Sequence, residues 1–385
     1  MIAFTSKLLL TPTDVIEDAL VVVDVGSVVS VGCRSSKEIS EKIELRDFGE
    51  GIIAPGFVDI HVHGAIGHDV MQNDAKGQIG MEQFLARHGI TSYFPTTVTA
   101  GVDAILSALE RLAAHIESAK NDGAGRAQPL GIHLEGPFLS HRRRGVHPAE
   151  GLLSPSMKAF DRFWQASGGN IRVMTIAPEL EGAEEVIREA TRRGVCVSLG
   201  HSDADIFNTR KGVAAGARHA THTFNAMRPL DHREPGIIGE VLTDKRVTAD
   251  VIADGVHVDP AIVALLLRAK GPEGAVLITD GTSATGMPEG RYNMGAFEVD
   301  VKGNRVLHDG TLAGSVLTLD RAVQNAMKFA QWELQDSVRV ASLNPAKTVC
   351  AKNKGFIAPG VDADFVVLTP KGEVMATIVK GVVVQ

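Results

Sequence analysis

The segment that most constrains the fold is Ala54–Gly64, which reads APGFVDIHVHG. This pattern is typical of a short buried strand that a glycine ends. Residues two apart in a strand project to the same side, so His61 and His63 can hold one metal ion between them. A His-x-His pair also arises by chance on half-buried strands, so the other strands of the chain have to decide between the two interpretations.

Four further strand-like runs end in a side chain that can bind a metal ion. They are GIHLE ending at Glu135, CVSLGH ending at His201, ARHATH ending at His222 and VLITD ending at Asp280. Together with the His-x-His strand they make chance a poor explanation. The sequence therefore predicts a metal centre that is assembled from the ends of several strands.

Strand-like and helical patterns alternate through the middle of the chain. The expected strands are Phe57–Val62, Thr91–Phe94, Leu130–Leu134, Arg172–Ile176, Val195–Leu199, Arg218–Thr221, Val247–Ala253 and Ala275–Thr279. The expected helices are Met81–His88, Val102–Ser118, Pro155–Gln165, Ala183–Arg193, Ala204–Ala214, Pro260–Lys270 and Thr318–Gln331. Eight parallel strand–helix units predict an α/β fold, a TIM-like (β/α)8 barrel whose strand C-termini meet at one mouth. A six-stranded doubly wound sheet is the alternative, but it leaves two strands without a place.

Short apolar runs separated by turn-forming residues occupy both ends of the chain, a pattern typical of small antiparallel strands. The expected strands are Lys7–Leu10, Ala19–Val25, Val28–Gly32, Gly355–Gly360, Ala363–Leu368 and Val374–Val384. We expect residues 1–53 and 351–385 to form one discontinuous β-sandwich domain, with the barrel at residues 54–350. The glycine-rich stretch from Gly281 to Gly310 predicts a loop with a hairpin over the barrel mouth.

Composition excludes several classes of function. The 385 residues carry a formal net charge of -7, which opposes nucleic-acid binding because such domains usually present a basic patch. No segment is long and apolar enough to span a bilayer, so we expect no membrane partner. The three cysteines, Cys33, Cys196 and Cys350, lie far apart and predict neither a disulfide framework nor a zinc knuckle. A cytoplasmic location fits these features.

Ligands after the first, third, fifth, sixth and eighth strands resemble the metal-dependent amidohydrolase superfamily. The resemblance sharpens to the N-acetylglucosamine-6-phosphate deacetylase family, whose motifs are matched in order along nearly the whole chain. The matching runs are HLEGPF (133–138), GVH (145–147), LGHS (199–202), THTFNAM (221–227), REPG (233–236), ADGVH (253–257), TDG (279–281) and LAGS (312–315). The resemblance implies an enzyme that hydrolyses the N-acetyl group of N-acetylglucosamine 6-phosphate to glucosamine 6-phosphate and acetate.

The expected metal site combines carboxylate and imidazole donors. Glu135, His201 and His222 suit a zinc-like catalytic site that keeps one position open, and they correspond to the ligands of the principal metal in the family. His61 and His63 can hold a second ion with Asp280, with Glu135 between the two. Some family members lack the paired histidines and use a single metal, so whether the chain binds one divalent ion or two stays open. Zinc is the first expectation, and iron, manganese or cobalt also suit these donors.

The chemistry expected at this site is metal-assisted hydrolysis. A divalent cation makes a water molecule acidic enough to act as a nucleophile near neutral pH. Asp280 would accept the proton from that water and return it to the departing sugar nitrogen. His147, with the metal, would stabilise the carbonyl oxygen as it gains charge. His133 shares a strand face with Glu135 and is expected to orient it rather than to bind metal.

The remaining pocket should recognise a phosphorylated amino sugar. Arg233 can bind phosphate oxygens through two parallel hydrogen bonds and His257 can add a donor. The resemblance implies that further residues line the substrate site, namely Val146, Asn225, Ala226, Asp254, Leu312, Ala313 and Gly314. It also implies a homodimer in which Arg233 or His257 reaches across the interface. The basic run Arg142–Arg144 is either a solvated loop or a device that steers the anionic substrate.

Other functions are compatible with parts of the pattern. A preference for N-acetylgalactosamine 6-phosphate stays open because the two sugars differ at a single hydroxyl. Cyclic amidases of the dihydroorotase and dihydropyrimidinase type share the barrel and the His-x-His pair, but they usually bridge two metals with a modified lysine, whereas the third strand here ends in Glu135. A non-catalytic assembly protein on a decayed scaffold should have lost ligands, and every expected ligand is present.

Overall fold

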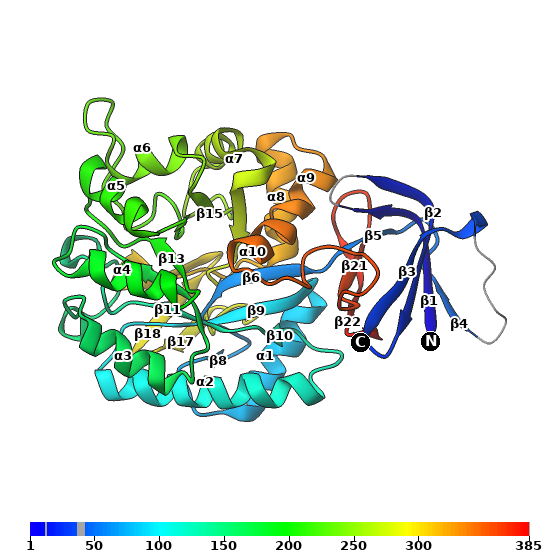
Figure 1. The fold of residues 1–385 in the computed structure, drawn as a ribbon, viewed down its shortest axis with the longest axis horizontal. Coiled ribbons are helices and arrows are strands. Elements are labelled where there is room, and N and C mark those ends of the chain that lie inside the picture. The colour runs from blue at the N-terminus through cyan, green and yellow to red at the C-terminus, as the bar shows by residue number, and fades with distance from the viewer. Residues whose placement is uncertain (12–13, 37–42, 385) are drawn as a thin grey trace.

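The structure is a computed structural model that describes residues 1–11, 14–36 and 43–384. Figure 1 shows a large unit of strands surrounded by helices, with a smaller β unit beside it that contains strands from both ends of the chain. The large unit carries the predicted ligand positions, and its strands determine where those side chains lie.

The predicted barrel strands are confirmed. They form a parallel sheet in which each strand pairs with the next one along the chain. The strands are β6 (Phe57–Val62), β9 (Ile90–Thr97), β11 (Ile132–Glu135), β12 (Ile171–Ile176), β13 (Cys196–Leu199), β14 (His219–Ala220), β15 (Thr248–Ile252) and β16 (Ala275–Ile278). A short strand, β10 (Gln128–Pro129), also pairs with β9. The six-stranded doubly wound alternative is therefore wrong.

The barrel closes between β16 and β6 through backbone hydrogen bonds at the strand ends. The amide of Asp280 donates to the carbonyl of His61 at 3.0 Å, and the amide of His63 donates to the carbonyl of Gly281 at 2.7 Å. Just below them, the buried carboxylate of Asp59 accepts from the Thr279 hydroxyl on the other strand. The contacts that complete the barrel thus set the spacing of three predicted ligand positions.

Helices cover the outside of the sheet (Figure 1). They are α1 (Ala75–Arg87), α2 (Val102–Asp122), α3 (Met157–Ala166), α4 (Ala183–Arg192), α5 (Ile206–Ala215), α6 (Gly236–Thr243), α7 (Pro260–Gly274), α8 (Leu319–Ala330), α9 (Leu334–Arg339) and α10 (Leu343–Thr348). Polar caps fix several starts, as at α7, where Asp259 accepts from the Ala261 amide at 2.8 Å and Pro260 occupies the first turn. Apolar residues of the strands and helices form the main core.

The helix predictions need correction at α1 and at α6, and the short helices α9 and α10 were not predicted. Helix α1 begins at Ala75, six residues before the predicted start, because the Asp74 side chain accepts from the Lys76 amide at 3.1 Å and caps the first turn. That turn lacks the helical spacing of apolar residues on which the prediction relied. Helix α6 lies between β14 and β15 and was not predicted. Its sequence, GIIGEVLT, contains two glycines and has no side-chain cap, so local signals give little sign of a helix.

The small unit is one sheet built from both ends of the chain. Its strands are β1 (Ile2–Leu10), β2 (Val15–Asp24), β3 (Ser27–Cys33), β4 (Glu44–Asp47), β5 (Ile52–Pro55), β21 (Phe365–Leu368), β22 (Val374–Val379) and β23 (Val382–Val383). The sheet curls onto itself, since the amide of Val28 donates to the carbonyl of Val361 at 2.9 Å and the ring of Phe4 packs on that of Phe365 with centroids 5.0 Å apart. The sheet therefore encloses its own core, much as the predicted sandwich would.

The details of the small unit differ from the sequence prediction in three ways. β1 pairs with β4 and β5 in parallel rather than antiparallel fashion. The stretch Gly355–Gly360 forms turns instead of a strand. The first segment extends to Pro55, two residues past the predicted boundary, because β5 pairs with β21.

A second small sheet lies in the glycine-rich stretch after β16. The predicted hairpin is present as β18 (Phe297–Lys302) and β19 (Arg305–His308), and β17 (Gly290–Met294) and β20 (Thr311–Leu312) extend it to four strands. A two-stranded pair, β7 (Gly64–Ala65) and β8 (His68–Asp69), follows β6. The Asp69 carboxylate accepts from the Gly295 amide at 2.9 Å, which ties the two small sheets together.

No helix in the described ranges is long and apolar enough to cross a membrane.

A buried ion pair anchors the C-terminal segment in the small unit. The Lys354 ammonium binds the Asp364 carboxylate, whose side chain is 3% exposed, and the Asp362 carboxylate at 2.7 Å. Burial lowers the pKa of Lys354, but the charges of Asp364 and Asp362 outweigh it and raise the pKa above its ordinary value. Lys354 therefore remains protonated throughout the neutral range.

We expect Lys354→Ala to lower the free energy of unfolding by about 3–5 kcal/mol, because it leaves a buried carboxylate without its partner. Urea titration followed by circular dichroism measures the change. Lys371→Ala, at an exposed lysine of the same unit, is the control and should change stability little. Equal stability of the two variants would contradict the anchoring role.

Candidate active site

Three of the predicted ligands follow barrel strands in an unusual backbone conformation. His201, His222 and Asp280 have φ angles of 47°, 30° and 50°, a left-handed region that residues other than glycine rarely adopt. Hydrogen bonds hold each in place: the carbonyl of His201 accepts from the Ser140 amide at 2.9 Å, and the amide of His222 donates to Asp250. Such backbone strain persists only where the surroundings enforce it, and it clusters at functional sites.

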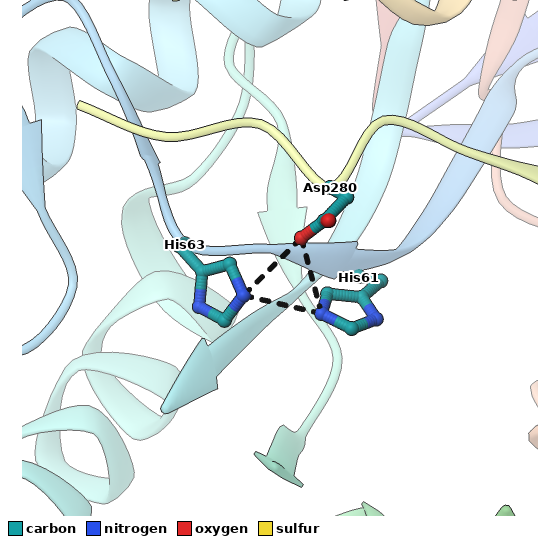
Figure 2. Close-up of side chains that lie close together, drawn as sticks. All are labelled: His61, His63 and Asp280. Atoms are coloured by element: carbon teal, nitrogen blue, oxygen red, sulfur yellow. Dashed lines mark hydrogen bonds and ion pairs between the residues drawn. The ribbon is translucent and has the colours of Figure 1, made fainter. Parts of the chain in front are cut away.

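His61, His63 and Asp280 form one group of donors. Figure 2 shows the imidazoles of His61, in β6, and of His63, just after it, pointing toward the Asp280 carboxylate that follows β16. Asp280 Oδ1 lies 3.4 Å from His61 Nε2 and 3.3 Å from His63 Nε2, and the two nitrogens are 3.2 Å apart. The period of a strand and the closure of the barrel thus bring the three side chains together.

The Glu135 carboxylate lies between this group and a second pair of histidines. Its Oε1 atom is 3.3 Å from His201 Nε2 and 3.1 Å from His222 Nε2. Its Oε2 atom is 3.4 Å from His61 Nε2 and 3.3 Å from His63 Nε2. Each oxygen therefore faces one histidine pair, an arrangement suited to a carboxylate shared by two cations.

The two buried carboxylates of the centre, Glu135 and Asp280, require nearby positive charge. Burial raises the pKa of Glu135 and of Asp280, but the nearby histidines outweigh it and hold that of Glu135 well below its ordinary value and that of Asp280 at about 2. Burial lowers the pKa of His222, yet Glu135 and the other carboxylates raise it to about 9. The buried carboxylates thus rely on protonated imidazoles, and a divalent cation among the same donors would supply that charge instead. The donor set fits a metal ion.

Two ligand histidines are held in the tautomer that metal binding requires. His63 Nδ1 lies 2.9 Å from the carbonyl of Thr96, and His201 Nδ1 lies 2.9 Å from the carbonyl of Arg143. A carbonyl only accepts hydrogen bonds, so Nδ1 carries the proton in both rings. The lone pair of each Nε2 therefore faces the centre.

His147 has the opposite arrangement. The backbone amide of Thr99 donates to its Nδ1 at 3.3 Å, and the Thr99 hydroxyl lies 2.8 Å from the same atom. Because Nδ1 accepts from an amide, the proton of the neutral ring is on Nε2, which lies 3.6 Å from Glu135 Oε2. His147 is thus placed to donate a hydrogen bond into the site. Its ring nitrogen also lies close enough to the ligand atoms of Glu135 and His201 for the three to share one ion.

The hydrogen bonds of His133 agree with an orienting role rather than with metal binding. Its Nδ1 donates to the carbonyl of Ile60 at 3.0 Å and its Nε2 lies 2.7 Å from the Thr175 hydroxyl. Burial lowers its pKa well below the ordinary value, so the ring is neutral and supports His61, whose ring centroid is 4.6 Å away. Since Ile60 lies on β6 and Thr175 on β12, only the three-dimensional packing reveals this role.

A cavity of about 620 Å³ opens at this centre. Most predicted substrate-binding residues line it, as do the ligands that face it: Val146, His147, Asn225, Ala226, His257, Leu312, Ala313, Gly314, His63, Glu135, His201, His222 and Asp280. Residues that the sequence analysis did not assign to the site also line it, namely Arg142, Arg143, Gly145, Met294, Gly310 and Thr311. Of these, only the charges of the arginines gave a sequence signal.

Two predicted substrate residues lie elsewhere. Asp254 lies behind His257, with its Oδ2 atom 2.7 Å from His257 Nδ1, so it orients the imidazole. Arg233 is exposed in the loop that precedes α6 and does not line the cavity of the single chain. His257 Nε2 is buried and has no hydrogen-bond partner within the described residues, which leaves it available to a ligand.

The family model that matches this chain is the amidohydrolase family, over residues 52–384. The chain belongs to the amidohydrolase family. It is 40% identical to the N-acetylglucosamine-6-phosphate deacetylase of Bos taurus over 352 residues, covering 88% of this chain and 84% of the relative. It is 36% identical to that of Bacillus subtilis (strain 168) over 375 residues, covering 97% and 94%. The crystal structure of the enzyme of the same name from Mycobacterium smegmatis matches with a TM-score of 0.92, 33% identity and full coverage of both chains.

We expect the purified protein to carry between one and two divalent ions per chain, since two histidine pairs face the two oxygens of Glu135. Elemental analysis measures the content. Replacing both His61 and His63 by alanine should remove one ion if two are bound and leave the other with His201 and His222. His232→Ala, at an exposed histidine, is the control. An active preparation without bound metal would contradict the assignment.

Proposed function

We propose that this chain hydrolyses the N-acetyl group of N-acetylglucosamine 6-phosphate to give glucosamine 6-phosphate and acetate. The observation that carries the proposal is the position of Glu135 and Asp280, which lie among histidines at the base of a cavity large enough for a small substrate. Relatives from Bos taurus and Bacillus subtilis bear the name of this activity. The Mycobacterium smegmatis enzyme is also known in complex with N-acetyl-D-glucosamine-6-phosphate.

We propose that Glu135, His201 and His222 hold the principal divalent ion and that His61, His63 and Asp280 hold a second. Zinc is the first candidate, with iron, manganese or cobalt as alternatives. When bound, such an ion polarises an amide carbonyl and makes a water molecule more acidic. Thr96 and the backbone of Arg143 keep His63 and His201 in the ligand tautomer.

Asp280 is the proposed proton carrier. Its carboxylate has a pKa of about 2, so it is ionised at neutral pH and can accept a proton from water. The sugar nitrogen would receive that proton when its bond to the acetyl carbon breaks, which leaves the free amine and acetate. The backbone bond from Asp280 to His61 holds the carboxylate in place.

His147 is proposed to stabilise the carbonyl oxygen. Its Nε2 proton points into the cavity because the Thr99 amide occupies Nδ1. As water adds to the amide, the carbonyl oxygen gains negative charge, and a donor already in place stabilises that charge without reorganisation.

The phosphate end of the substrate is proposed to meet His257 and, from a second subunit, Arg233. The free Nε2 atom of His257 and its support by Asp254 favour a role in binding an anion. The exposed position of Arg233 favours a homodimer in which it completes the site of the partner. The backbone at Asn225 and Ala226 and the segment Leu312–Gly314 would line the sugar site.

The competing activities lack support. No relative named here bears a cyclic amidase activity, and Glu135 occupies the place of the bridging lysine of those enzymes. The galactosamine derivative is likewise not favoured by the relatives. The cytoplasmic location stays a prediction.

Acetate release from a panel of N-acetylated sugars tests the proposed function. The panel contains N-acetylglucosamine and N-acetylgalactosamine, each with and without the 6-phosphate. We expect N-acetylglucosamine 6-phosphate to give the highest kcat/KM and chelation to abolish turnover. Failure to release acetate from any 6-phosphate by metal-loaded protein would contradict the proposal.

Asp280→Asn should lower kcat at the upper end of the usual 10²- to 10⁴-fold range, about 5 kcal/mol of barrier, because one carboxylate serves both proton transfers. The ion held by Glu135, His201 and His222 should persist, and substrate affinity should change little. Single-turnover kinetics with metal analysis measures both effects. Near-normal turnover by the metal-loaded variant would assign proton transfer to another group.

Arg233→Ala should raise KM for the 6-phosphate sugar far more than it alters turnover of the unphosphorylated sugar, because it removes a permanently charged guanidinium. Steady-state kinetics on the two substrates measures the ratio, and light scattering measures the oligomer. Equal effects on both substrates would make Arg233 structural. A fully active monomer would show that Arg233 of a second subunit is not needed to complete the phosphate site.

A further inference from the structure

We propose that Arg142 is a second cationic contact for the substrate phosphate, supplied by the same chain that holds the catalytic centre. The inference rests on the proposed function. It concerns the basic run Arg142–Arg144, which the sequence left open between a solvated loop and a steering device.

The basic run is fixed against the metal-binding side of the cavity. The carbonyl of Arg143 accepts from His201 Nδ1 at 2.9 Å, and the preceding Ser140 amide donates to the carbonyl of His201 at 2.9 Å. At Gly145 an added Cβ would lie 3.4 Å from the ring of His201 and 3.9 Å from the Cβ of Ala226. The loop thus packs between a proposed metal ligand and a proposed substrate-binding segment, and its position is set by both.

The three arginines have different environments. Arg143 is 33% exposed, and its Nε donates to Asp203 Oδ1 at 2.8 Å. Arg142 is 83% exposed, and its Nη1 lies at a longer distance of 3.4 Å from Asp203 Oδ2. Arg144 is exposed and reaches the carbonyl of His141 at 3.4 Å, away from the cavity lining. Arg142 therefore lines the cavity with most of its donors turned to solvent.

Asp203 pairs with both arginines, more closely with Arg143 than with Arg142. Partial burial raises the pKa of Asp203, but hydrogen bonds from the arginines, that of Arg143 first, lower it below its ordinary value. Glu179 fixes the chain at Asp203. Its carboxylate accepts hydrogen bonds from the Asp203 amide at 2.6 Å and from the Ser202 hydroxyl at 2.7 Å. One carboxylate with a close arginine already bound leaves the charge of Arg142 largely uncompensated.

The charge balance of the cavity favours an anion contact at Arg142. Within the described residues that line it, the permanent cations are Arg142 and Arg143, while Glu135 and Asp280 supply negative charge at the metal end. The chain as a whole carries a net charge of -7, which repels a phosphorylated sugar. A guanidinium with free donors at the cavity wall can bind phosphate through two parallel hydrogen bonds.

The test compares Arg142→Ala with the matched control Arg144→Ala in metal-loaded protein. We expect Arg142→Ala to lower kcat/KM for N-acetylglucosamine 6-phosphate about tenfold, mainly through KM, and to leave the value for N-acetylglucosamine unchanged. Arg142→Lys should fall in between, because it keeps the charge and loses the planar fork. Arg144→Ala should match the parent protein on both sugars.

Calorimetric titration with inorganic phosphate gives a readout that does not depend on turnover. We expect Arg142→Ala to weaken phosphate binding by a similar factor and Arg144→Ala to leave it unchanged. An unchanged phosphate affinity, or an equal loss of kcat/KM on both sugars, would overturn the role of Arg142. If the parent protein binds phosphate through Arg142 but releases no acetate, the proposed reaction fails while the phosphate contact stands.

Discussion

The constraint on which the centre depends is the burial of two carboxylates. Glu135 and Asp280 are 2% and 7% exposed, and a buried charge without compensation is strongly unfavourable. Four imidazoles lie 3.1–3.4 Å from these carboxylates. His63 and His222, whose pKa values are raised, supply positive charge, and a divalent cation among the same donors would supply it more fully. The left-handed backbone of His201, His222 and Asp280 is the strain that this arrangement maintains.

The same contacts serve the barrel and the site. The hydrogen bonds that join β16 to β6 involve the backbone of His61, His63 and Asp280, so the fold cannot close in another register without moving these side chains. Asp59, in β6, also joins the two strands, because its carboxylate accepts a hydrogen bond from the hydroxyl of Thr279, which directly follows β16. Placing these side chains on the closure of a parallel barrel gives them the rigidity of the sheet, while the loops around Arg142 and Leu312 line the cavity beside them.

The sequence predicted the barrel and the six proposed ligands because both depend on local pattern: strands of period two, each ending in a histidine or a carboxylate. It failed where distant contacts decide. Helix α6 lacks a capping side chain, and its apolar residues become informative only against the barrel. The proton on His147 is set by the amide of Thr99, 48 residues away, which no spacing rule can reveal. Arg142 and Arg144 look alike in the sequence, and only the folded loop shows that Arg142 lines the cavity while Arg144 reaches the carbonyl of His141.

The central claim is that Glu135 lies between two groups of metal ligands and that His147 stays outside both. Anomalous diffraction from crystals of the metal-loaded protein tests it most directly. We expect an anomalous-difference peak within bonding distance of Glu135, His201 and His222. If a second ion is bound, we expect another peak beside His61, His63 and Asp280. His147 should lie in neither coordination sphere, with Nδ1 still at the Thr99 amide. A principal ion bound by His147, or placed away from Glu135, would contradict the account.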